Sequence, residues 1–290
     1  MNLEEMDFAA LLDLADEFRP YLFALILSLV RAYAFMSASQ ILAPTAVPRL
    51  ARQAAILVIV IPIVPANLAA ARDFDPSIPE FAVFFLKEYA LGFLLGYMVA
   101  WLFWAVQAAG AFIDNQRGAA IAASIDPLQG HETSPLGILF SQAFVTYFFT
   151  VGGFLLVLDL IYQSYVSWPV TRGIPALTDV FPALVLEVFD TGMRLMFVLA
   201  APIIAIMFLA EFALAIVSRF APQVQVFIIA MPIKSAIAFL ILIFYFATMF
   251  AVARDNADLF RPLMDRTYAI LRAGAELLDE FGFDLAPGGR

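Results

Sequence analysis

Six long apolar runs constrain this chain more than any other feature of its sequence. A helix needs about 20 mostly apolar residues to cross a membrane. Runs of this kind cover residues 21–36, 54–71, 81–109, 133–158, 181–217 and 226–253. We therefore expect an all-α membrane protein with about six long apolar helices, because helices satisfy their own backbone hydrogen bonds in lipid.

The composition supports a membrane protein and argues against several other classes. Hydrophobic residues make up 63% and charged residues 14% of the 290 residues, against roughly 45–50% and 25% in soluble domains. The chain has no cysteine and one histidine, so we expect no metal site and no cofactor. A net charge of -9 argues against a nucleic-acid partner, which needs a basic face. The sequence contains no G-x-S-x-G, H-E-x-x-H or P-loop motif, so we do not expect an enzyme.

Prolines and glycines predict kinked and closely packed helices. Pro62 and Pro65 interrupt the second run and Pro202 interrupts the fifth, because proline lacks the backbone donor that a helix needs. Gly92 and Gly96 form a G-x-x-x-G pattern, which lets two helix backbones approach closely. Such helices are expected to pack against protein more than against lipid.

The sequence divides into three regions. Residues 1–19 are predicted to form an amphipathic, acidic N-terminal segment, residues 20–253 a membrane domain, and residues 254–290 an aqueous charged tail that begins as a helix. Within the membrane domain, residues 110–135 are small and polar. Irregular backbone at membrane depth persists only inside protein or beside water, so we predict a re-entrant or pore-facing element there. Residues 218–234 are predicted to be an inter-helix loop.

Several charged residues lie in or beside the apolar runs, where an unpaired charge is costly. Two interpretations stay open: structural pairing or anchoring at the interface, and proton relay or substrate coordination. The second would suit a stand-alone secondary transporter using Asp159, Glu211 and Lys234, although the two halves show no clear internal repeat. The charged residues concerned are Arg31, Lys87, Glu88, Asp159, Arg194, Glu211 and Lys234.

Three stretches that follow one another along the chain resemble a single protein family. The stretches are Gly110-Ala-Phe-Ile-Asp-Asn-Gln-Arg-Gly118 with Asp126-Pro127 and Ser134-Pro-Leu-Gly137; Ser164-Tyr-Val-Ser-Trp-Pro-Val170; and Arg219-Phe-Ala-Pro-Gln-Val-Gln-Val-Phe227 with Pro232-Ile-Lys234. Together they resemble the T component of the type III secretion export apparatus, the SctT/FliR family, in its virulence injectisome form. The resemblance covers about residues 20–253.

The resemblance implies a non-enzymatic structural and gating subunit. Members of the family assemble with the R and S components and are contacted by the U component, in the bacterial inner membrane. The assembled complex passes unfolded secreted proteins. For this chain the resemblance implies helical hairpins packed in a hetero-oligomeric export gate, with membrane lipid as a further neighbour.

Within residues 110–135 the resemblance favours a gate. Phe112 and Ile113 would seal a constriction, while Asp114, Gln116 and Arg117 would hold it through hydrogen bonds. The alternative is a helix-breaking turn in which an acid and a base three residues apart neutralise each other. The gate or plug candidates are Phe112, Ile113, Asp114, Asn115, Gln116, Arg117 and Gly118.

The third stretch is predicted to contact neighbouring subunits. Pro222 ends a helix, and the amides of Gln223 and Gln225 can bridge neighbouring backbones. Lys234 offers donors to carbonyl groups or acids of an adjacent subunit; the alternative is an ordinary loop with a snorkelling lysine. The candidates for this contact are Arg219, Pro222, Gln223, Gln225, Phe227, Pro232 and Lys234.

Overall fold

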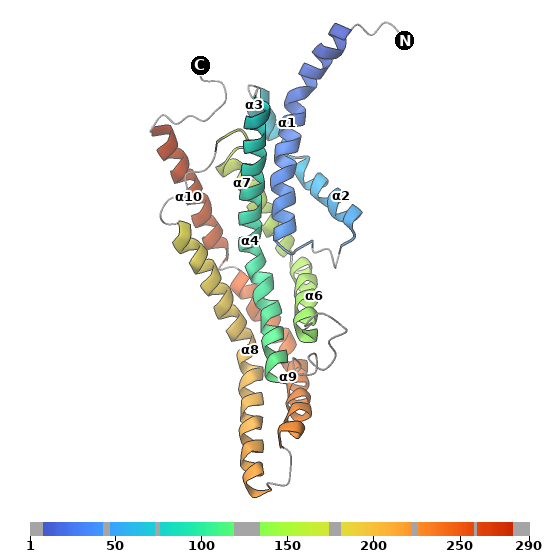
Figure 1. Ribbon diagram of the computed structural model, residues 1–290, viewed down its shortest axis with the longest axis vertical. Coiled ribbons are helices and arrows are strands. Elements are labelled where there is room, and N and C mark those ends of the chain that lie inside the picture. Colours follow the sequence, from blue (N-terminus) through green and yellow to red (C-terminus); the bar gives the residue numbers. More distant parts are fainter. Residues whose placement is uncertain are drawn as a thin grey trace. The chain divides into compact units, whose positions relative to one another are not determined.

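A computed structural model describes residues 8–42, 47–72, 76–118, 134–173, 181–221, 226–257 and 260–280. Every regular element in these ranges is an α-helix. The helices are α1 (Phe8–Ala38), α2 (Arg49–Val60), α3 (Ile63–Arg72), α4 (Ile78–Gln116), α6 (Pro135–Thr150), α7 (Gly153–Ser167), α8 (Phe181–Phe220), α9 (Val226–Ala257) and α10 (Phe260–Glu280) (Figure 1). The predicted all-α architecture is confirmed.

Four helical stretches are long and apolar enough to cross a membrane, and the pair of α6 and α7 adds a fifth if it counts as one bent span. The four are Glu17–Ala38, Ile78–Gln116, Phe181–Phe220 and Ile228–Ala253. The prediction of a multi-pass membrane protein is therefore confirmed, with a span count slightly below the expected six.

The breaks in the apolar runs explain the lower count. The second run is divided at Pro62 into α2 and α3, of 12 and 10 residues, each too short to cross a bilayer alone. The fourth run bends by 80° between α6 and α7. Gly152 lies at this bend with φ of +81°, a conformation that glycine adopts without steric cost.

Helices continue across the predicted regional boundaries. Residues 8–19 of the predicted N-terminal segment and the first span form one continuous helix, α1. The predicted loop at 218–234 is shorter, because α8 continues to Phe220 and α9 begins at Val226. Pro232 lies inside α9, where an apolar helix tolerates proline if neighbouring groups satisfy the freed carbonyl.

The chain forms two compact units. Unit 1 consists of Met1–Ala100, Phe154–Leu184 and Met264–Arg290, and unit 2 consists of Trp101–Gly153 and Val185–Leu263. Helices α4 and α8 contribute residues to both units. The contacts below lie within one unit or the other.

In unit 1, α1 and α4 run in the same direction and touch through their backbones. Near one end, Phe23 faces Phe81 with ring centroids 5.3 Å apart. Further along, Gly96 lies so close to Phe35 that a Cβ atom would collide with the Phe35 carbonyl oxygen. Gly92 meets the backbone of Arg31 in the same way. The close approach that the G-x-x-x-G pattern predicts is present.

Helix α10 lies in the predicted charged tail, which was expected to begin as a helix, and it packs onto other helices of unit 1. The Tyr268 hydroxyl donates to the Leu160 carbonyl at 2.6 Å, and the Arg272 guanidinium donates to Ser167 Oγ at 3.2 Å. Burial raises the pKa of Tyr268 above its usual value. Met264 and Leu271 are buried on the same side of the helix. The tail therefore begins as an amphipathic helix with one face covered.

The described part of unit 2 contains two antiparallel hairpins. The C-terminal part of α4 pairs with α6: Phe103 lies 5.5 Å from Phe144 between ring centroids, whereas Asp114, eleven residues later, contacts Ser134 at the start of α6. Helices α8 and α9 form the second hairpin (Figure 1), in which Lys234 of α9 lies 3.3 Å from Glu211 of α8. Phe144 also meets Phe250 of α9 at 6.1 Å. Aromatic rings thus fill the core of this unit.

Candidate functional site

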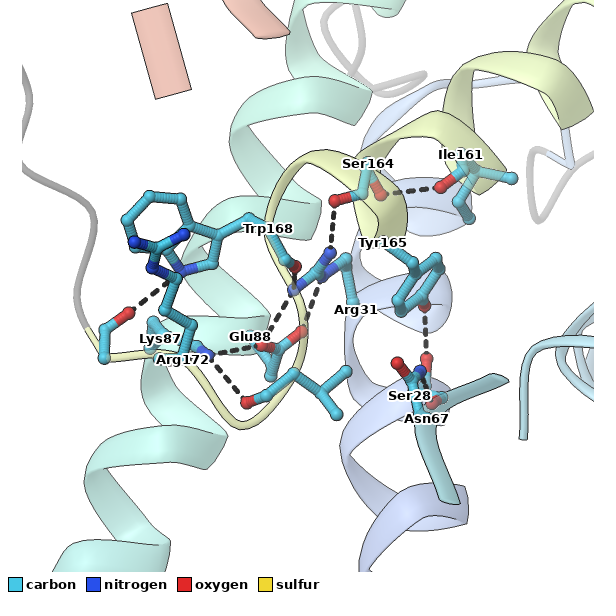
Figure 2. Close-up of polar contacts among 12 residues, drawn as sticks. Ser28, Arg31, Asn67, Lys87, Glu88, Ile161, Ser164, Tyr165, Trp168 and Arg172 are labelled. Atoms are coloured by element: carbon cyan, nitrogen blue, oxygen red, sulfur yellow. Dashed lines mark hydrogen bonds and ion pairs between the residues drawn. The ribbon is translucent and has the colours of Figure 1, made fainter. Parts of the chain in front are cut away.

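Three of the predicted membrane-embedded charges meet in one cluster in unit 1 (Figure 2). The Arg31 guanidinium donates to both carboxylate oxygens of Glu88, from Nε at 2.5 Å and from Nη2 at 2.9 Å. The Lys87 ammonium lies 2.7 Å from Glu88 Oε1. All three side chains are at most 2% exposed. Two-pronged contacts between arginine and carboxylate are among the stronger hydrogen bonds in proteins.

The cluster carries a net charge of +1, and the end of α7 compensates for it. Arg31 donates to the carbonyl groups of Ser164 and Trp168, each at 2.8 Å. Carbonyl groups at a helix C-terminus lack helical donors and carry partial negative charge. Arg31 therefore anchors this helix end electrostatically as well as by hydrogen bonds.

Lys87 holds the chain just beyond α7. Its ammonium donates to the carbonyl groups of Val170 at 2.8 Å and Arg172 at 2.5 Å. With Glu88 as the third acceptor, all three ammonium protons have partners. The Trp168 indole folds back to donate to the Gly173 carbonyl at 2.9 Å, so this short segment is fixed at several points.

A second layer of polar contacts surrounds Arg31 (Figure 2). The Tyr165 hydroxyl donates to the Ser28 carbonyl at 2.6 Å, and the Asn67 amide donates to Ser28 Oγ at 2.9 Å. The Arg31 guanidinium lies 4.4 Å from the centroid of the Tyr165 ring. Among the described residues, no buried side-chain nitrogen or oxygen lacks a hydrogen-bond partner. The network is saturated, which favours structural pairing for these three charges over proton relay.

The Ser164–Val170 motif gains a role that sequence reasoning did not assign to it. The motif was identified by its resemblance to the family. In the structure, Arg31 and Lys87 bind its backbone carbonyl groups, and not its side chains alone. The available signal was a Trp-Pro pair directly after an apolar helix, in a chain with only two lysines. Backbone acceptors leave no mark in a sequence, so the pairing itself was not predictable.

A second polar cluster closes the neck of the predicted gate segment in unit 2. Asp114 accepts hydrogen bonds from Arg117 Nε at 2.7 Å, from Ser134 Oγ at 2.6 Å and from the Leu136 backbone nitrogen at 2.8 Å. Ser134 in turn caps α6 by accepting from the Gly137 backbone nitrogen at 2.9 Å. One carboxylate therefore joins the end of α4 to the start of α6. The pairing of Asp114 with Arg117 is present, together with contacts beyond the simple turn.

The other gate candidates differ in their surroundings. Ile113 is fully buried, whereas Phe112 is half-buried with its ring 5.6 Å from that of Phe197. Asn115 is exposed, and Gln116 is half-buried. Residues 119–133, including the Asp126-Pro127 pair and most of the predicted polar segment, lie outside the described residues. Gly118 ends the described part with φ of +85°.

The remaining predicted charges are divided between the two units. Lys234 Nζ lies 3.3 Å from Glu211 Oε2 in unit 2, with the two side chains 11% and 48% exposed. Asp159 is exposed on α7, in the other unit, where its charge acts on Tyr268. Arg194 forms an exposed pair on α8, 3.4 Å from Asp190. The three residues of the transporter alternative thus belong to two different units.

The third motif is only partly described. Arg219 is exposed in the last turn of α8, and Pro232 is exposed in α9. Pro222, Gln223 and Gln225 lie outside the described residues, as does the side chain of Phe227. Within the described ranges, no group of three or more potential metal ligands occurs.

Comparison with known proteins gives these clusters a context. The family model described as "Bacterial export proteins, family 1" matches residues 22–259. That range contains both polar clusters and nearly all of the four candidate spans. The chain belongs to family 1 of the bacterial export proteins.

Individual relatives of this export protein come from virulence and flagellar systems. It is 46% identical over 187 residues to the Yop proteins translocation protein T of Yersinia pestis, covering 62% of this chain and 72% of that protein. It is 36% identical over 163 residues to the surface presentation of antigens protein SpaR of Salmonella typhimurium, covering 56% and 60%. It is 33% identical over 186 residues to the flagellar biosynthetic protein FliR of Bacillus subtilis, covering 64% and 72%. The predicted family and the predicted role in type III secretion export are confirmed, in preference to a stand-alone transporter.

Proposed function

We propose that this export protein is a non-enzymatic structural and gating subunit of an export gate in the bacterial inner membrane. It assembles there with the R and S components, is contacted by the U component, and forms part of the entry channel for secreted proteins. The observation that supports this most is the family match over residues 22–259, which includes the saturated polar clusters of both units.

The exposed surface of the α8–α9 hairpin supports an assembly. Only 28% of the most apolar window of each helix is buried within the chain. Large apolar side chains therefore require lipid or other subunits as neighbours. Examples that are more than half exposed are Phe208, Leu209, Phe212, Leu240, Ile243 and Phe244.

The Asp114 cluster supports a gate within the predicted polar segment 110–135. One carboxylate binds Arg117 at the end of α4 and Ser134 and Leu136 at the start of α6, so these two helix ends are held together. In this proposal Phe112 seals the constriction, while Ile113 anchors the seal within unit 2.

The test combines secretion with assembly. Cells lacking the chain should lose secretion and regain it from a plasmid copy. Purification in mild detergent, followed by native mass measurement, should then give a defined hetero-oligomer containing the R and S components. A lone monomer, or secretion that continues without the chain, would contradict the proposal. The Arg194→Met variant, which removes an exposed ion pair, serves as a control that should assemble normally.

A further inference from the structure

Helix α2 has an exposed apolar face, formed by Leu50, Leu57 and Val58. These side chains are 80%, 44% and 65% exposed. Successive residues turn by about 100° along a helix, so the three side chains fall within about 100° of the helix circumference. Ile61, directly after the helix, continues this apolar face and is also exposed. Apolar side chains of this size are costly in water, so the face requires a non-aqueous neighbour.

The opposite side of α2 packs within unit 1. Ile56, Ile59 and Val60 are buried on that side, where α2 contacts α1. The Tyr162 hydroxyl of α7 donates to the Ile59 carbonyl at 3.3 Å. The start of α2 lies further from α1 than its end does (Figure 1). The C-terminal half of the helix is therefore held by the chain, whereas its N-terminal half projects from unit 1.

Two arginines lie in this N-terminal half, on the side away from the apolar face. Arg49 is exposed and Arg52 is half-buried, and among the residues that the structure describes neither forms an ion pair. Both lie roughly 120° or more from the centre of the apolar face around the helix axis. Residues 18–72 contain no acid, although the chain has 25 acidic residues and a net charge of -9. The positive charge of α2 is therefore not neutralised by its own stretch of sequence.

This combination differs from the exposed surface of the α8–α9 hairpin. There, exposed apolar side chains accompany an acid and a base that pair with each other, whereas in α2 they accompany unpaired cations alone. An apolar face with arginines on the other side is typical of helices that lie in the plane of the membrane interface. Anionic lipids attract basic residues there. With 12 residues, α2 is also too short to cross a bilayer.

We propose that α2 lies along the membrane–water interface and binds anionic phospholipid. Its apolar face contacts the acyl chains, while Arg49 and Arg52 bind the phosphate groups of the lipids. A guanidinium can bind phosphate through two parallel hydrogen bonds, and a long arginine side chain can reach from the helix to the headgroups. The inference depends on the chain being a membrane protein, and not on its role in export.

The test uses the absence of native cysteine from the chain. Leu57→Cys is labelled with a fluorophore, and the purified protein is placed in phosphatidylcholine vesicles, both alone and in its assembled complex. Spin-labelled phosphatidylglycerol or phosphatidylcholine, with the nitroxide on the same acyl carbon, is added as a quencher. At equal mole fraction the phosphatidylglycerol should quench more strongly, because the two lipids differ only in the headgroup. Val58→Cys provides a second labelling position on the same face.

Charge variants show whether the arginines cause this preference. Each arginine near an anionic surface contributes about 1 kcal/mol, so replacing both should lower the relative affinity for phosphatidylglycerol roughly tenfold or more. Arg49→Gln with Arg52→Gln should therefore quench alike with the two lipids. Arg49→Lys with Arg52→Lys keeps the charge and should keep most of the preference. Arg194→Gln, which removes an exposed arginine of α8, should behave like the unaltered protein.

Several results would overturn the proposal. Equal quenching of the unaltered protein by the two lipids would mean that α2 meets lipid without selecting the headgroup. Quenching by aqueous iodide in place of lipid would put the apolar face in water. Lipid quenching that is lost in the assembled complex would show that another subunit covers this face. A preference that survives Arg49→Gln with Arg52→Gln would exclude the arginines as its cause. Since secretion is not measured, failure of the proposed export function would leave these results unchanged.

Discussion

Arg31 and Glu88 lie 57 positions apart in sequence and form a two-pronged ion pair in which neither side chain is more than 1% exposed. Lys87 adds a second cation to the same carboxylate. Among the residues that the structure describes, Glu88 is therefore the one acidic partner of two buried cations. The two partners of this pair are not equivalent, and their removal should have different consequences.

Replacing Glu88 should be more harmful than replacing Arg31. Glu88→Gln leaves two buried cations without an anion, whereas Arg31→Met leaves Lys87 and Glu88 as a neutral pair. Removing one partner of a buried ion pair typically costs about 3–5 kcal/mol. We expect Glu88→Gln to lower the free energy of unfolding by at least this amount, and Arg31→Met to lower it by less. The measurement is the loss of the monodisperse peak when the purified export protein is heated in detergent.

The exposed pair on α8 is the matched control for this comparison. Arg194 and Asp190 are 77% and 72% exposed, and solvent-exposed pairs contribute little to stability. Arg194→Met should therefore behave like the unaltered protein. Equal loss of stability in Glu88→Gln and Arg31→Met would show that the charge balance described here does not govern the cluster.

The glycines at the contact of α1 and α4 give a second prediction. Gly96→Val places a side chain against the Phe35 carbonyl oxygen, where even a Cβ atom does not fit. Overpacking a close contact typically costs about 1–3 kcal/mol, and here the obstacle is backbone that cannot rotate away. The variant should be depleted from membranes. Ala90→Val, on an exposed side of α4, should accumulate normally; similar depletion of both variants would exclude the close contact as the cause.

The sequence predicted the helical class, the multi-pass character and most of the long helices because apolar length is a direct requirement of the bilayer. It located the charges of the Arg31 cluster but not their pairing, since the acceptors at the end of α7 are backbone carbonyl groups. It overestimated the number of spans at Pro62 and Gly152, because a run of apolar residues does not reveal how far the chain bends. The packing of α10 was missed because seven of its 21 residues are charged, which suggested an aqueous helix, while its buried face is narrow.

Tyr268 provides a prediction for α10. Tyr268→Phe removes the hydrogen bond to the Leu160 carbonyl and should cost roughly 0.5–1.5 kcal/mol. Because burial raises the pKa of Tyr268, the folded state favours the protonated hydroxyl. This stabilisation is complete below the ordinary tyrosine pKa of about 10 and is lost as the pH rises above it.

The pH dependence of stability distinguishes the ionisation of Tyr268 from a general effect of alkali. Unaltered protein should lose stability above about pH 10, and Tyr268→Phe should lose less over the same range. The measurement is protease cleavage of α10 in detergent as a function of pH. Identical pH profiles for the two proteins would remove Tyr268 from the account of how α10 is held.

The neck at Asp114 gives the prediction most closely tied to gating. Asp114→Ala removes the acceptor shared by Arg117, Ser134 and the Leu136 nitrogen, which releases the two ends of the segment between them. The assembled complex should form, and the membrane should become permeable to small ions, as read by loss of a potential-sensitive dye. Arg194→Met, which removes an exposed ion pair on α8, should not leak. Background permeability in an assembled Asp114→Ala complex would argue against this segment as the gate.

Variants of Lys234 and Glu211 test whether this ion pair only neutralises its own charges within the α8–α9 hairpin or also binds a neighbouring subunit. Lys234 is 11% exposed and Glu211 is 48% exposed, so the Glu211 side chain is accessible to another subunit. Lys234→Met should reduce co-purification with the R and S components, because it leaves a carboxylate unpaired among apolar side chains.

The double variant decides between the two roles. In Lys234→Met with Glu211→Met no charge remains, so a pair that only neutralises itself should be rescued and assembly should return. If the lysine also donates to an adjacent subunit, as the sequence predicts, the double variant should assemble as poorly as Lys234→Met alone. If the single variant assembles fully, the interface does not need Lys234, and Lys234 is an ordinary snorkelling lysine.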